Sequence, residues 1–137
     1  MKIEFKLQGR VIPATLADNA AAQAFAAMLP LTITMHDLFK REKFGALPGC
    51  ISAEPTRTAV CEAGDMICWT AGPDLTIFHR QDGQPTRGGF QVLGRLDFGA
   101  EAFGAPGPLE VSIAMANDPV RIERRRRTAS MAGQTGA

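Results

Sequence analysis

The side chains best suited to metal or acid–base chemistry are the two histidines of this 137-residue chain, His36 and His79. With a carboxylate such as Asp37, Glu42 or Asp65, they could form a site of two histidines and one carboxylate, a set that binds iron and similar metals. The spacing does not favour this, because the histidines lie on separate segments and belong to no ligand motif. We therefore predict no metal site and no cofactor.

The three cysteines, Cys50, Cys61 and Cys68, are an odd number without C-x-x-C spacing, which indicates neither a disulfide framework nor a zinc site. A nucleophilic thiol needs a base in a defined local setting, and Cys68 lies beside Trp69 in a strand-like run with no such motif. We predict buried, reduced thiols. A disulfide between Cys61 and Cys68 across a turn is the alternative.

Three glycines, Gly88, Gly89 and Gly94, lack a phosphate-binding pattern. No G-x-x-x-x-G-K or G-x-G-x-x-G run leads into a helix. We interpret these glycines as turn residues, and the chain contains no catalytic signature.

The composition is that of an average soluble protein, with 45% hydrophobic and 21% charged residues. No run approaches the length of a membrane span, and the first residues alternate charged and apolar side chains instead of forming a signal peptide. We predict one domain over residues 1–120, located in the cytoplasm and without membrane contact.

The net charge of +1 is unevenly distributed. Residues 121–137 contain five arginines and one glutamate, so that this tail carries +4 and the rest of the chain −3. Because a nucleic-acid-binding face needs clustered positive charge, we predict none on the globular part. The tail is predicted to be disordered and solvated. Binding of nucleic acid or an anionic membrane, or phosphorylation of Thr128 or Ser130, is the alternative.

The segments that must position these side chains begin with a predicted hairpin over residues 2–16. Apolar and charged residues alternate there with a period of two, and Gln8-Gly9 forms the turn. Pro13 cannot donate a ladder hydrogen bond, so we expect the second strand to lie at an edge of the sheet or to contain a bulge at this residue.

One helix is predicted between residues 18 and 30. Asp18 or Asn19 caps it, alanines favour it, and Pro30 ends it. The apolar stripe of this helix should cover one end of the sheet, and consists of Phe25, Met28 and Leu29.

The remaining elements are short predicted strands, at residues 31–36, 58–62, 65–70, 75–79, 90–97 and 109–115. The charged segment 37–49 is expected to form an irregular, lid-like loop, and residues 81–89 and 99–108 to form links. About eight strands without β–α–β alternation favour a mainly β fold, a small closed antiparallel barrel with one main helix.

Four sequence segments follow one another in a characteristic order: DNAAAQAFAAMLPLT, EKFGALP at residues 42–48, GDMICWTAGPDLTIF from Gly64, and LGRLD at residues 93–97. This order resembles the cyclophilin-like fold family, small bacterial and archaeal proteins of largely unassigned function. The likeness runs over about residues 2–115. It implies a closed or nearly closed antiparallel barrel with helices over its ends.

Cyclophilins themselves are peptidyl-prolyl isomerases, and Phe78-His79-Arg80 has the F-H-R sequence found around their catalytic arginine. Here the tripeptide ends the hairpin that resembles a later part of cyclophilins, and no I-P-G-F or Q-G-G-D run follows. The resemblance makes Arg80 the candidate catalytic residue of a weak isomerase, with Trp69 and Phe78 as apolar walls. The missing segments favour a barrel without this activity.

The same hairpin borders the peptide-binding face of cyclophilins, so that the resemblance places Trp69 and Phe78 near a groove. The charged loop could contribute Arg41, Glu42 and Lys43 to its mouth, and a solvated, salt-bridged loop is the alternative. We predict a barrel that binds a small ligand or peptide without isomerase activity. Weak prolyl isomerisation, or a structural role as a homodimer paired through edge strands, are the alternatives.

Overall fold

The computed structural model of the protein describes residues 1–49, 56–59, 61–69 and 72–116. The domain boundary predicted at residue 120 and the tail predicted for residues 121–137 lie outside the described residues, as does Cys50. None of the helices in the described part of the chain has the length and apolar character that a membrane crossing requires.

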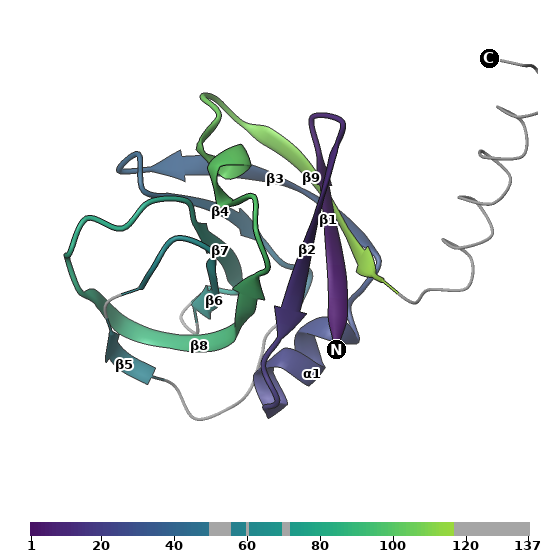
Figure 1. Ribbon diagram of the computed structural model, residues 1–137. Coiled ribbons are helices and arrows are strands. Elements are labelled where there is room, and N and C mark those ends of the chain that lie inside the picture. Colours follow the sequence, from purple (N-terminus) through teal and green to yellow (C-terminus); the bar gives the residue numbers. More distant parts are fainter. Residues whose placement is uncertain (50–55, 60, 70–71, 117–137) are drawn as a thin grey trace, which may run out of the picture.

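Antiparallel strands close into a barrel (Figure 1). Eight strands follow one another around it in the order β2-β1-β9-β3-β4-β7-β6-β8, and β8 pairs back with β2. A further strand, β5, pairs with β8 outside this ring. The strands are β1 (Lys2–Leu7), β2 (Arg10–Leu16), β3 (Leu31–Leu38), β4 (Glu42–Ala46), β5 (Thr56–Ala59), β6 (Asp65–Trp69), β7 (Asp74–Phe78), β8 (Thr86–Leu96) and β9 (Leu109–Met115). The predicted closed antiparallel barrel with one main helix is confirmed.

The N-terminal hairpin, β1 and β2, forms around the predicted turn. Gln8 and Gly9 have φ angles of 48° and 76°, and a turn with two positive φ angles matches the twist of the flanking strands. Pro13 lies just before the pairing of β2 with β8, and its carbonyl accepts a hydrogen bond of 2.9 Å from the backbone N–H of Asp97. The edge expected at Pro13 is therefore limited to the first half of β2, because the second half closes the barrel.

Strand β8 bends where it passes from β6 to β2. The register between β6 and β8 shifts at Met66 and Ile67, which marks a bulge. A Cβ atom at Gly94 would collide with the backbone of Thr15 and Leu16 on β2. The prediction of turn residues is wrong, because Gly88, Gly89 and Gly94 all lie within β8, where Gly94 permits the close approach that closes the barrel.

One end of the barrel is covered by helix α1 (Ala20–Ala26). Its N-cap is Asn19, as predicted, whose side chain accepts a hydrogen bond of 2.7 Å from the backbone N–H of Ala22. The helix ends earlier than predicted, with Ala27 as its C-cap, and the chain reaches Pro30 through a tighter turn whose hydrogen bonds span three residues. The fully buried Phe25 anchors α1 in the interior.

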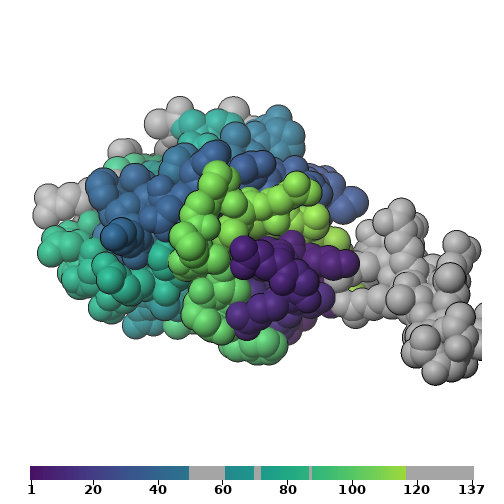
Figure 2. All heavy atoms as spheres, turned by 90° about the horizontal axis from the view of Figure 1, so that it is seen from above, coloured from purple at the N-terminus to yellow at the C-terminus, as the bar shows by residue number. Residues whose placement is uncertain are grey.

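The opposite end is covered by a short 3-10 helix, η1 (Ala100–Gly104), within the predicted link at 99–108. Phe103 packs edge-to-face on Phe5, with ring centroids 5.6 Å apart. Arg10 donates a hydrogen bond of 3.1 Å to Glu101. Figure 2 looks onto this η1 end, where the green segment lies beside the purple hairpin.

Strand β4 overturns the prediction of a lid-like loop over residues 37–49. It pairs with β3 on one side and with β7 on the other. A tight turn at Phe39 and Lys40, with φ angles of 58° and 51°, joins β3 to β4. The adjacent charges of Glu42 and Lys43 conceal the strand in the sequence, because both side chains are buried against partners instead of facing water.

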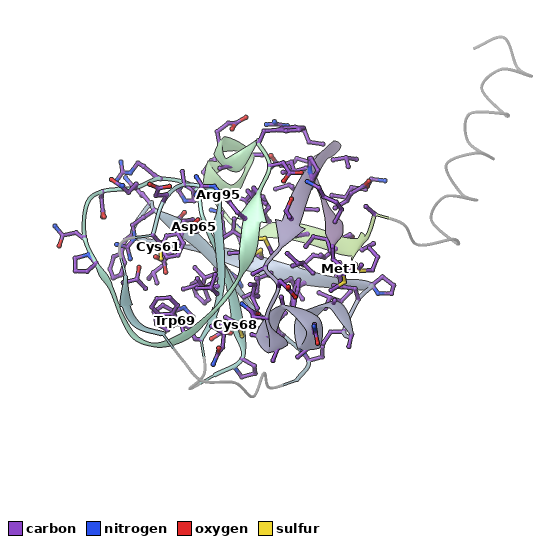
Figure 3. All side chains as sticks on the ribbon, turned by 60° about the horizontal axis from the view of Figure 1, so that its bottom comes forward. Met1, Cys61, Asp65, Cys68, Trp69 and Arg95 are labelled. Atoms are coloured by element: carbon purple, nitrogen blue, oxygen red, sulfur yellow. The ribbon has the colours of Figure 1, made fainter. Side chains whose placement is uncertain are left out.

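Side chains that alternate between the two faces of the strands form two apolar clusters. The interior core fills the barrel and includes residues of α1, η1 and most strands. The second, the outer cluster, consists of Cys61, Ile67, Phe78 and Phe90, with half-buried Trp69 against it. Successive side chains of a strand point to opposite faces, and on β6 the interior Cys68 precedes Trp69 (Figure 3). The outer cluster therefore lies on the outside of the barrel wall.

Candidate functional site

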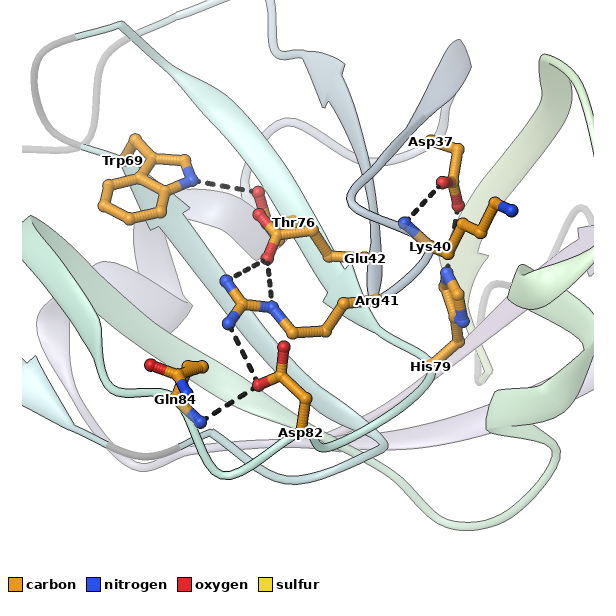
Figure 4. A network of polar contacts seen from close by, with 9 residues as sticks. All are labelled: Asp37, Lys40, Arg41, Glu42, Trp69, Thr76, His79, Asp82 and Gln84. Carbon is orange, nitrogen blue, oxygen red and sulfur yellow. Dashed lines mark hydrogen bonds and ion pairs between the residues drawn. The ribbon is translucent and has the colours of Figure 1, made fainter.

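Three charged side chains, Arg41, Glu42 and Asp82, form an outer ion cluster beside the outer cluster (Figure 4). Nε and Nη2 of Arg41 donate to Oε2 of Glu42 at 3.1 and 2.9 Å, and Nη1 donates to Oδ1 of Asp82 at 3.3 Å. The guanidinium also lies over the ring of Phe78, 5.5 Å from its centroid. These contacts hold the β3–β4 turn against the outer face of the barrel.

Burial and pairing oppose each other in this cluster. Glu42 is 1% exposed, and burial raises the pKa of its carboxyl, although Arg41 partly offsets this. Burial also disfavours the Arg41 cation, but its hydrogen bonds to Glu42 and Asp82 outweigh that cost and raise its pKa. Arg41 is therefore a charged group whose donors are engaged by its own neighbours.

A groove with a volume of about 200 Å³, the outer groove, opens next to this cluster. It is lined by Leu38, Glu42, Phe44, Trp69 and Asp74. Trp69 Nε1 donates a hydrogen bond of 3.0 Å to Oγ1 of the buried Thr76, which fixes the indole in the wall (Figure 4). Within the described residues, Asp74 forms no ion pair. Chemically, the groove offers apolar walls and one carboxylate that no described cation pairs with.

A second pocket, the end pocket, has a volume of about 460 Å³ and lies at the η1 end. Its lining residues are Asp37, Lys40, His79, Gly104, Pro106 and Gly107. Oδ1 of Asp37 accepts from Lys43 Nζ at 3.2 Å and lies 3.1 Å from His79 Nε2, while Oδ2 accepts from the backbone N–H of Lys40 at 2.8 Å. Burial disfavours the Asp37 carboxylate, but these hydrogen bonds outweigh it and hold its pKa below the usual value.

Four of the five predicted binding residues lie together. Trp69, Phe78, Arg41 and Glu42 are all on the outer face of the wall. Lys43 follows Glu42 on β4 and points the other way, where it is fully buried and pairs with Asp37. The predicted set therefore divides between the two faces of the wall, and only Trp69 and Glu42 line the outer groove itself.

Arg80, the candidate catalytic residue, is exposed and lies just beyond the end of β7. Its backbone N–H donates a hydrogen bond of 3.2 Å to the carbonyl of Arg41. Among the described side chains, Arg41 lies against the outer cluster, through its contact with Phe78.

The remaining candidates have ordinary structural roles. Cys61 and Cys68 are buried free thiols, as predicted, and burial raises the pKa of Cys61. The alternative of a disulfide between them is wrong, because they belong to clusters on opposite faces of the wall. His36 lies against Phe44, with ring centroids 6.0 Å apart. No group of three or more metal-ligating side chains occurs within the described residues.

The relationship to known proteins follows the fold. The model of the cyclophilin-like family matches residues 5–114. The chain belongs to this family. The solution structure of a hypothetical protein from Archaeoglobus fulgidus is similar with a TM-score of 0.68, over 85% of this chain and 95% of that one, at 18% identity. At this identity the likeness shows a shared cyclophilin-like barrel alone. No curated protein matches the chain.

Several residues of this cyclophilin-like barrel escape a reading of the sequence alone. Asp82, Thr76 and Asp74 contact or line the outer ion cluster and the outer groove. The sequence offers Asp37 and His79 only as possible metal ligands, whereas the structure pairs them with each other in the end pocket. One signal in the sequence could have indicated the two sites. If residues 42–46 are treated as a strand, successive side chains alternate between its faces, so that Glu42 and Lys43 point to opposite sides.

Proposed function

We propose that this cyclophilin-like barrel binds a small ligand or a peptide in the outer groove and does not isomerise prolyl bonds. The observation that carries the proposal is the half-buried Trp69, fixed by Thr76 in a groove that also holds the carboxylate of Asp74, which forms no ion pair with a described residue. An aromatic wall beside a few placed polar groups is typical of ligand sites.

The size and charge of the groove favour one class of ligand. About 200 Å³ is below the range of most small-molecule pockets and accommodates a single side chain. Since Arg41 compensates Glu42, the sign of the groove is set by Asp74. A lysine or arginine side chain could pack its alkyl part on Phe44 and Trp69 and place its cation at Asp74. We therefore propose a peptide with a basic side chain as the ligand.

Two features argue against isomerase activity. Such an enzyme needs an arginine held against the prolyl amide nitrogen, beside an open apolar pocket for the ring. Arg41 is engaged by Glu42 and Asp82. The outer cluster is itself packed, with Phe78 and Phe90 at most 1% exposed. The Arg41 cation and the apolar surface of Phe78 and Phe90 are thus occupied by the chain's own side chains.

Fluorescence tests the binding proposal, because Trp69 is the single tryptophan of the chain. Three capped tetrapeptides that differ only in one central lysine, glutamate or leucine are titrated into the full-length protein. We expect a saturable change in emission with the lysine peptide. Asp74→Asn should weaken its binding roughly fivefold, the effect of about 1 kcal/mol, whereas the matched control Asp18→Asn should not. No saturable change with any peptide would overturn the proposal.

A protease-coupled assay on a proline-containing peptide tests the isomerase alternative separately. We expect no rate above the uncatalysed reaction. A catalysed rate that falls in Arg80→Ala or Arg41→Ala would establish the isomerase instead.

A further inference from the structure

The end pocket has no part in the proposed function of the outer groove, because it lies at the η1 end of the barrel. It combines a volume of about 460 Å³ with an oriented histidine and the exposed Lys40, while the buried Lys43 pairs with the lining residue Asp37. We propose that this pocket is a second binding site, which takes a small molecule through an oxyanion group, phosphate or carboxylate, held by His79 and Lys40.

One ring nitrogen of His79 contacts Asp37, and the other has no hydrogen-bond partner among the described residues. Nε2 lies 3.1 Å from Oδ1 of Asp37, so that this carboxylate fixes the ring as it does in other carboxylate–histidine pairs. Within the described residues, Nδ1 has no hydrogen-bond partner. A Cβ atom at Gly104 would lie 3.2 Å from Nδ1, so a larger residue at this position would crowd that edge of the ring. A protonated ring can therefore donate Nδ1–H to an oxygen in the pocket.

The charges around the pocket favour an anion. The buried Lys43 compensates Asp37 at 3.2 Å, and the side chain of His79 is only 8% exposed. Lys40 lines the pocket and forms no ion pair with any described residue. Lys40 and Lys43 together carry two positive charges near the pocket, whereas Asp37 carries one negative charge. The region is therefore positive even without a charge on His79, and a bound anion would balance the excess.

The remaining walls fit a compact ligand. Gly104, Pro106 and Gly107 supply backbone and proline ring atoms but no carboxylate. A volume of about 460 Å³ lies within the range of small-molecule sites. An oxyanion bonded to Nδ1 and Lys40 would leave room for a small apolar part against these walls.

The two histidines provide an internally controlled experiment. Inorganic phosphate and acetate are each titrated into the full-length, 15N-labelled protein, with sodium chloride at matched ionic strength as the blank. Long-range proton–nitrogen spectra of the imidazoles are recorded. We expect a saturable shift of the His79 ring nitrogens with at least one of the two anions, and no such shift of His36, which lies against Phe44. A response to phosphate alone or acetate alone identifies the class of oxyanion.

Two variants test the assigned donors by calorimetry. Lys40 has a φ angle of 51°, a conformation that asparagine tolerates, so that Lys40→Asn removes the charge without backbone strain. We expect a loss of affinity of about fivefold, as for one exposed ion pair. His79→Gln retains an amide nitrogen near Asp37 and should abolish binding. Equal shifts at both histidines, no saturation, or unchanged affinity in both variants would overturn the proposal.

Discussion

Two neighbouring residues of β4 bury opposite charges on opposite faces of the same wall. Glu42 and Lys43 are 1% and 0% exposed. On the outer face Glu42 shares the guanidinium of Arg41 with Asp82, so that one cation is surrounded by two carboxylates. On the other face Lys43 shares Asp37, a lining residue of the end pocket, with His79, so that one carboxylate contacts both a lysine and a histidine. The first arrangement is closed on itself, whereas the second leaves a ring nitrogen open to a pocket.

We expect the largest loss of stability when the buried ammonium of Lys43 loses its carboxylate partner, Asp37. Asp37→Ala leaves the ammonium of Lys43 buried without an ion pair among the described residues. Removing one partner of a fully buried pair costs about 3–5 kcal/mol, and we expect about 2–3 kcal/mol because the side chain of Asp37 is 29% exposed. Urea denaturation measures this loss in the free energy of unfolding.

The control is the double variant Asp37→Ala with Lys43→Met. An apolar side chain of similar length removes the unpaired charge, so that most of the lost stability should return. If the double variant is no more stable than Asp37→Ala alone, the buried ammonium is not the cause of the loss.

A smaller effect is expected on the outer face. In Glu42→Ala, Arg41 keeps its hydrogen bond to Asp82 and its position over Phe78. We expect a loss of about 1–2 kcal/mol, from the lost hydrogen bonds and the cavity left by a buried side chain. A loss greater than that of Asp37→Ala would reverse the contrast between the two regions.

The dependence of stability on pH should have opposite signs for the two carboxyls. The lowered pKa of Asp37 means that its contribution is present above its usual value of 3.8 and is lost as the pH falls through the lowered pKa. The raised pKa of Glu42 means that its contribution is present below 4.5 and is lost as the pH rises through the raised pKa. Asp37 therefore favours the folded state towards neutral pH, whereas Glu42 favours it towards acid pH.

Unfolding curves between about pH 2.5 and 7 check these signs. Asp37→Asn should reduce the loss of stability at the acid end. Glu42→Gln should reduce the loss at higher pH. Parallel curves for the wild type and both variants would contradict the assignment.

The smallest effect concerns the indole. Thr76→Val keeps the shape of the side chain but removes the acceptor of the Trp69 hydrogen bond, which should cost about 0.5–1 kcal/mol. The emission of Trp69 should also change, whereas the matched control Thr34→Val, on an exposed residue of β3, should alter neither property. Unchanged emission in Thr76→Val would mean that this bond does not hold the indole.

Much of the barrel follows from local sequence signals. The turn at Gln8-Gly9, the cap at Asn19 and the last strand, Leu109–Met115, need nothing beyond alternation and turn chemistry. Gly94 does not follow from such signals, because its role depends on the backbone of β2, which is distant in the sequence. Strand β4 escapes prediction for a related reason: buried charges resemble solvated ones until their partners are known.

The candidate sites could be predicted only in part. Trp69 and Phe78 are recognisable from the hairpin that resembles cyclophilins, and both lie at the outer face. The division between Glu42 and Lys43 depends on the strand assignment of their segment. Asp82 lies forty-one positions from Arg41, and long-range ion pairs of this kind leave no trace in local spacing.

One titration tests most directly whether the two faces of the wall are separate binding sites. The lysine peptide and phosphate are added in turn to the labelled protein, while the indole N–H of Trp69 and the ring nitrogens of His79 are observed together. We predict that the peptide shifts the Trp69 signal alone and that phosphate shifts the His79 signals alone. A single ligand that shifts both groups, or a peptide that shifts only His79, would contradict the separation of the two sites.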